Sequence, residues 1–161
     1  MGSRMELVAG DAGEIMVGIG AEESEALRDP DRFRAYLSLS GGMDPTWLDF
    51  FSEACRSATD RDAPVDFIDA RTELGGDQES TAEIPGARTV ERVDPTWVAA
   101  VAAIPDVTID GLAGRWIDRI EEDLGQLASE EKPWVRELAG DLVRFCRTAA
   151  GAPDVVFVWS L

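Results

Sequence analysis

Carboxylates are the side chains of this sequence with the widest chemical scope, because it contains 32 Asp and Glu residues and no histidine. Without imidazole, histidine-based acid–base catalysis, His-activated Ser or Cys nucleophiles and imidazole metal sites are excluded. Two converging carboxylates can still catalyse hydrolysis, one as acid and one as base. No pair stands out among the 32 candidates, so we predict no catalytic residue. A carboxylate-dependent hydrolase acting without histidine is the alternative to a non-enzymatic function.

Residues 60–79 are the least structured stretch of the sequence and are rich in aspartate. The candidate binding residues there are Asp60, Asp62, Asp66 and Asp69. The spacing of the first three is similar to the start of a calcium-binding loop, but Val65 stands where such a loop requires glycine. We therefore predict no metal site. Exposed aspartates suit recognition of a basic protein surface, with a merely solubilising role as the alternative.

The charge balance of the whole chain restricts its partners. The 161 residues include 15 basic and 32 acidic side chains, which gives a net charge of −17. Binding to nucleic acid or to an anionic membrane needs clustered Lys and Arg, so both partners are excluded. A small anionic domain suits fast, electrostatically steered binding to a basic protein. We predict a non-enzymatic binding protein, of the kind that inhibits a basic protein or confers immunity to it.

No cofactor is predicted. Gly18-Ile19-Gly20 is similar to the start of a dinucleotide-binding fingerprint, but Glu23 takes the place of the third glycine. Neighbouring glutamates would also repel a phosphate from the start of the following helix. The oligomeric state is left open.

One tetrapeptide occurs twice, as Asp44-Pro45-Thr46-Trp47 and Asp94-Pro95-Thr96-Trp97. Asp is placed to cap a helix whose first residue is Pro, and Asp29-Pro30 offers the same signal a third time. Trp47 and Trp97 are candidate binding residues. The alternative interpretation is a capping device in which the Trp anchors each helix in the core.

The two cysteines, Cys55 and Cys146, lie in apolar helical patterns, so we predict buried, reduced thiols. The sequence contains no apolar stretch of about 18 residues and no signal-peptide pattern. These features predict a cytoplasmic protein. Residues 1–13 are expected to be a tag or a flexible N-terminus.

The expected fold is one α+β domain over residues 14–161, mostly helical, with a small sheet. Apolar runs predict strands at residues 14–19, 65–69, 87–93 and 155–159. Apolar spacing of three to four residues predicts helices at residues 21–28, after Asp44, after Asp94 and before Pro105, at 108–127 and at 129–150. Because residues 155–159 are all apolar, this strand should be central, beside the strand at 14–19.

The order of these stretches resembles the bacterial YfbM-like family of unknown function, DUF1877. The matching stretches are Met16 to Leu37, Asp44 to Cys55, Ala87 to Val98, and Leu142 to Ala150 followed by Val155 to Trp159. The resemblance implies an α+β domain and supplies no activity. In that family histidines usually follow the Trp of the first Trp helix, and here residues 48–51 contain none.

Overall fold

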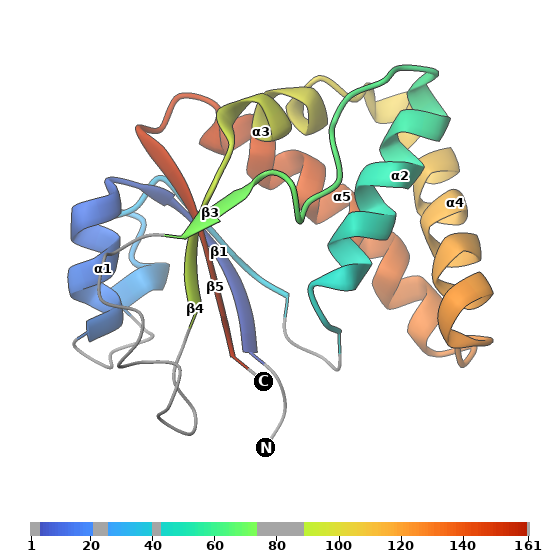
Figure 1. The fold of residues 1–161 in the computed structure, drawn as a ribbon, viewed down its shortest axis with the longest axis horizontal. Coiled ribbons are helices and arrows are strands. Elements are labelled where there is room, and N and C mark those ends of the chain that lie inside the picture. Colours follow the sequence, from blue (N-terminus) through green and yellow to red (C-terminus); the bar gives the residue numbers. More distant parts are fainter. Residues whose placement is uncertain (1–3, 21–25, 40–42, 74–88, 161) are drawn as a thin grey trace.

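The computed structural model describes residues 4–20, 26–39, 43–73 and 89–160. A five-stranded antiparallel sheet with the order β2-β1-β5-β4-β3 divides this part of the chain into two layers (Figure 1). The strands are β1 (Arg4–Gly10), β2 (Ala35–Ser38), β3 (Arg71–Glu73), β4 (Thr89–Val93) and β5 (Asp154–Ser160).

Helices cover both faces of the sheet. On one face lie α2 (Thr46–Thr59), α3 (Pro95–Ala102), α4 (Asp106–Leu124) and α5 (Glu131–Ala149), which share one hydrophobic core with the sheet. Of these, α3 and α5 contact the strands, and α4 packs on α2 and α5. The other face packs against α1 (Ala12–Gly20) and the short 3-10 helix η1 (Ala26–Arg28). The described residues therefore form a single α+β domain, and the predicted helices after Asp94 and over the long C-terminal stretches are confirmed.

β5 is the central strand, as the sequence predicts. Val155 and Phe157 lie in the core between the sheet and helices α2 to α5, whereas Val156 and Val158 lie in the core on the α1 side. All four are at most 6% exposed. A strand between two helical layers must be apolar on both faces, which explains the unbroken run of apolar residues.

The strand that pairs with β5 at the N-terminal end of the chain is β1, and the predictions for this region are wrong. Leu7 pairs with Phe157 and is fully buried, so residues 4–10 are not a flexible terminus. Residues 14–19 belong to helix α1 and form no strand. Asp11 starts this helix, since its Oδ1 accepts the Glu14 N–H at 3.1 Å. Ile15 is buried while Val17 is 67% exposed, which is helical and not alternating burial.

At the third Asp-Pro pair, Asp29-Pro30, the chain forms a turn and not the start of a helix. Asp29 accepts the Asp31 N–H on Oδ1 at 2.9 Å, and its carbonyl accepts the Phe33 N–H at 3.0 Å. The chain must turn here because Phe33 is buried against the α1 face of the sheet just before β2 begins. Of the helix predicted over 21–28, only residues 26–28 are described, and they form η1.

Candidate interaction surface

The four predicted aspartates lie on one segment, Asp60–Ala70, which we call the acidic segment. It leaves the end of α2, where Asp60 adopts a left-handed φ of 53°, and crosses the molecule to β3 (Figure 1). The predicted strand at 65–69 is wrong. The Asp69 N–H donates to the Asp66 carbonyl at 3.0 Å and the Ala70 N–H to that of Phe67 at 3.1 Å, so these residues form a turn.

An inner row of side chains fixes the acidic segment to the core. Pro64, Phe67 and Ala70 are buried at intervals of three residues. The Phe67 ring packs edge-on against Trp97, with ring centroids 4.9 Å apart, and against Phe157 at 5.1 Å. Aromatic pairs in this geometry are favourable beyond the area that they bury. The inner row therefore belongs to the hydrophobic core.

Two polar side chains of α2 hold the backbone of the acidic segment. Arg56 donates from Nη1 to the Pro64 carbonyl and from Nη2 to Asp66 Oδ1, both at 2.8 Å. Asp49 Oδ1 accepts the Ile68 N–H at 2.7 Å. The segment is thus held in one conformation without belonging to a helix or strand.

Burial is the main cause that raises the pKa of Asp49. The hydrogen bond from Ile68 and the charge of Arg71 act in the opposite direction, while the charges of Asp66 and Asp69 raise this pKa further. Two aspartates of the acidic segment therefore add to the effect of burial on the pKa of Asp49.

The outer row of the acidic segment faces solvent. Val65 is 50% exposed and Ile68 is 59% exposed. Asp60, Asp62 and Asp69 are exposed around them, and Asp66 is partly exposed in its ion pair with Arg56. Two aliphatic side chains surrounded by carboxylates make a surface that offers both apolar contact and negative charge.

Trp47 and Trp97 do not belong to this surface, because they are 8% and 1% exposed. The Trp97 indole donates to Ser52 Oγ at 2.9 Å, and the Trp47 carbonyl accepts the Trp116 indole N–H at 2.8 Å. Asp94 caps α3 with Pro95 as the first helical residue, as the sequence predicts, whereas α2 begins one residue later, at Thr46, with Pro45 at its N-cap. Asp44 accepts the Thr46 N–H at 2.7 Å, and Asp94 accepts the Thr96 N–H at 2.9 Å. The tetrapeptide therefore lies at helix starts and its tryptophan anchors each helix in the core. Neither tryptophan is part of the candidate surface.

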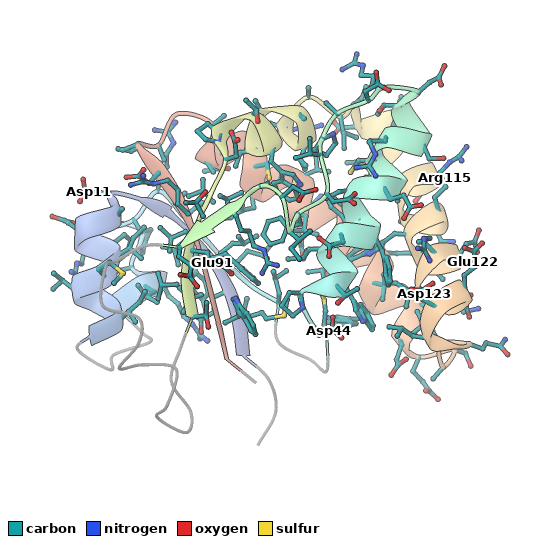
Figure 2. All side chains as sticks on the ribbon, in the orientation of Figure 1. Asp11, Asp44, Glu91, Arg115, Glu122 and Asp123 are labelled. Atoms are coloured by element: carbon teal, nitrogen blue, oxygen red, sulfur yellow. The ribbon has the colours of Figure 1, made fainter. Side chains whose placement is uncertain are left out.

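A second acidic area, on α4, is organised differently. Arg119 lies between Glu53 at 2.8 Å and Asp123 at 2.7 Å, and its guanidinium stacks 4.6 Å from the centre of the Phe50 ring. Arg115 and Glu122 also lie on the outer side of α4 (Figure 2). One arginine lies between two carboxylates and a second arginine is nearby, so the area presents both signs of charge.

Hollows on the surface of the described residues give no support to the hydrolase alternative. One hollow is lined by Asp106, Val107, Ile109, Asp110, Arg144 and Arg147. Another is lined by Glu53, Ala54, Ser57, Arg115, Asp118, Arg119 and Glu122. Neither contains an aromatic side chain, and each places arginines among its carboxylates. Within the same described ranges, no three potential ligands gather in a way that could hold a metal ion.

The sheet carries a largely buried ion pair, Arg71 with Glu91, that the sequence does not predict. Arg71 donates from Nη1 to Glu91 Oε1 at 3.1 Å, and the Trp159 indole donates to the same oxygen at 2.7 Å. The three residues come from β3, β4 and β5, and Glu91 lies on the sheet in Figure 2. These three residues meet only through the pairing of the strands, and no local sequence motif predicts that they do.

Both cysteines are buried and free, as the sequence predicts. Burial raises the pKa of the Cys55 and Cys146 thiols, which disfavours the reactive thiolate. Across the described part of the chain, no single helix has the length and apolarity of a membrane span.

No family model matches the chain, and no similar curated protein or solved structure is found. The resemblance to the YfbM-like family therefore stays a prediction.

Proposed function

We propose that this chain is an acidic, non-enzymatic binding protein of the bacterial cytoplasm whose acidic segment docks on a basic protein. One observation carries the proposal: Val65 and Ile68 are exposed among four aspartates on a segment that the core and α2 hold in place. An inhibitor or immunity-type partner of a basic protein fits this description.

The fixed conformation of the acidic segment favours binding. A flexible loop loses conformational freedom when it docks, and this loss weakens the complex. Here Phe67 in the core and the Asp49–Ile68 hydrogen bond restrict the backbone before any partner arrives. Val65 and Ile68 can then supply apolar contact, while the surrounding carboxylates steer the approach.

The net charge of −17 favours a basic partner over a second copy of the same chain, because two such surfaces repel each other. The same argument favours a protein over a nucleic acid. Lys and Arg side chains that flank a small apolar side chain would complement the acidic segment best.

The proposal is tested with the acetylated, amidated peptide KKLLKK as a stand-in for a basic surface. The peptide is titrated into isotopically labelled protein while backbone amide shifts are followed. We expect the largest shifts over residues 60–70. The peptide KKSSKK has the same charge and should bind more weakly, because it cannot cover Val65 and Ile68.

Two outcomes would contradict the proposal. Shifts spread evenly over acidic residues of α4 and α5 would show non-specific charge attraction. Equal affinity for the two peptides would show that the exposed aliphatic side chains take no part.

A further inference from the structure

A buried guanidinium on the sheet has a donor group that none of the described residues uses. The Arg71 side chain is 8% exposed, and its Nη1 is occupied by Glu91. Its Nε is buried without a hydrogen-bond partner, and the hydrogen bond found for this guanidinium among the described residues is the one from Nη1. Nε–H and one Nη2–H point from the same edge of the planar group, so a two-donor edge has no acceptor among the described residues.

The surroundings hold this guanidinium in place. Its central carbon lies 5.2 Å from the centre of the Phe67 ring and 5.5 Å from that of Phe157. Glu91 is itself fixed, because the oxygen that accepts from Arg71 also accepts the Trp159 indole N–H. Glu91 therefore accepts from Nη1 of Arg71 and not from the edge formed by Nε and Nη2.

We propose that Arg71 binds the carboxylate group of a small ligand, whose two oxygens accept hydrogen bonds from Nε and Nη2. Paired hydrogen bonds of this kind match the planar fork of arginine to the planar carboxylate. The Glu91 carboxylate, 3.1 Å from the same guanidinium, balances its charge. A singly charged carboxylate is therefore favoured over a doubly charged phosphate.

This site is separate from the proposed docking surface. The outer row of the acidic segment faces solvent, whereas Arg71 lies against the inner aromatic Phe67 and the sheet. A basic partner can fail to bind the acidic segment while a carboxylate still binds Arg71, and the reverse also holds. Each proposal can fail without the other.

The test is a titration of nitrogen-labelled protein with sodium acetate at neutral pH, following the side-chain Nε–Hε signals of arginine. The Arg71 signal is assigned by its loss in Arg71→Lys. We expect this signal to shift saturably with acetate and to stay in place with sodium chloride at the same concentration. No shift, or the same shift with chloride, would overturn the proposal.

Variants sharpen the test. Glu91→Gln removes the neighbouring negative charge and should tighten acetate binding by on the order of ten-fold. Arg92→Lys is the matched control, because Arg92 is a half-exposed arginine of β4 paired with Asp154 at 3.1 Å, and it should leave the titration unchanged. Should Arg71→Lys fail to fold, the signal most displaced by Glu91→Gln assigns Arg71 instead. Tighter binding of inorganic phosphate than of acetate would contradict the choice of a carboxylate.

Discussion

The inner and outer rows of the acidic segment lie within a few residues of each other and have opposite surroundings. Phe67 is fully buried between Trp97 and Phe157, whereas the next residue, Ile68, is 59% exposed. An exposed aliphatic side chain on a loosely held loop is weak evidence for a binding surface, because its position is not fixed. On a segment that is fixed from behind, it has a defined position on the surface.

The contrast with α4 supports the same conclusion. Arg119 there pairs with both Glu53 and Asp123, so a cation lies between these carboxylates. In the acidic segment only Asp66 has an ion pair among the described residues, and exposed aliphatic side chains stand beside the remaining aspartates. Acidity and exposed aliphatic side chains occur in both regions, since α4 exposes Val107 and Leu124 near its two ends. The acidic segment differs because Val65 and Ile68 lie three residues apart among its four aspartates.

The largest expected effect comes from removing the strand that supports the inner row. Deleting residues 155–161 takes away Phe157 and the central strand of the sheet. Each buried large side chain contributes about 1.5–3 kcal/mol, against a typical net stability of about 5–15 kcal/mol. We expect an insoluble or molten product in thermal unfolding and near-ultraviolet circular dichroism. A cooperative transition near that of the full chain would contradict the role of β5 as the core of the sheet.

Neighbouring substitutions compare the two rows directly. Phe67→Ala should lower the free energy of unfolding by about 3–5 kcal/mol, because it leaves a cavity between two aromatic rings. Ile68→Ala should change it by no more than about 0.5 kcal/mol, as is usual for exposed positions. Urea unfolding measures both. Similar losses for the two variants would mean that the rows do not differ as described.

A smaller effect is expected at the helix start that adjoins the inner row. The Asp94 N–H donates to the Ala70 carbonyl at 2.8 Å, and the Asp94 carboxylate caps α3. Asp94→Ala should cost about 1 kcal/mol in urea unfolding, the usual size of a lost cap. Asp94→Asn is the control that keeps an acceptor oxygen.

The stability that the Asp94 cap contributes should also depend on pH. The Thr96 backbone and hydroxyl hydrogen bonds hold the pKa of Asp94 below its ordinary value of 3.8. A folded-state pKa below the unfolded one means that this stabilisation is present above pH 3.8 and is lost as the pH falls through the lowered value. A difference between wild type and Asp94→Ala that grows on acidification would contradict this sign.

The smallest effect concerns Asp49, which holds the backbone of Ile68 in the outer row. Burial raises its pKa above 3.8, so ionisation costs the folded state stability as the pH rises through the raised value. Asp49→Asn keeps an acceptor for the Ile68 N–H without the charge. We expect it to be more stable than wild type at neutral pH by no more than about 0.5 kcal/mol, since solvent screens a partly exposed group. Below pH 3.8 the two proteins should unfold alike, and a loss of stability in Asp49→Asn at neutral pH would contradict the account.

Much of the helical layer could be predicted from the sequence because its signals are local. Asp94 followed by Pro95 starts α3, and apolar spacing marks α4 and α5. The apolar run of β5 likewise implies helices on both faces of the sheet. These features depend on short-range geometry that a single sequence contains.

The N-terminal region could not be predicted as well, because a short apolar run fits either a strand or a buried helix. Ile15 to Ile19 is such a run, and its flanking glycines favoured a strand. The overlooked signal is Asp11 followed three residues later by Glu14, which is the spacing of a capping box. β1 lies within residues 1–13, for which the sequence predicts a tag or a flexible N-terminus.

The candidate surface likewise has a part that the sequence predicts and a part that depends on tertiary contacts. The four aspartates were predicted from the acidity of residues 60–79, and in the structure three of them are exposed and Asp66 is partly exposed. Which aliphatic residue of the acidic segment faces solvent depends on Phe67 meeting Trp97, a residue 30 positions away in the sequence. Arg71 and Glu91 meet only through the pairing of β3 with β4. Such tertiary contacts have no local signal.

The most direct test of the docking surface compares two variants of equal charge. One replaces Asp60, Asp62, Asp66 and Asp69 by Asn, and the other replaces four exposed acids elsewhere, Asp110, Asp118, Glu130 and Glu137, by their amides. The measured quantity is the dissociation constant for the fluorescently labelled peptide KKLLKK, at about 0.02 M and about 0.3 M salt, since the Debye length shortens over this range.

We predict that the first variant binds at least about ten-fold more weakly at low salt, a change of about 1.4 kcal/mol, while the second changes affinity by less than about two-fold. Wild-type binding should weaken as salt is added, because the attraction of exposed charges is screened. Equal weakening by both variants, or wild-type binding that is insensitive to salt, would contradict the proposal that the acidic segment is the docking surface.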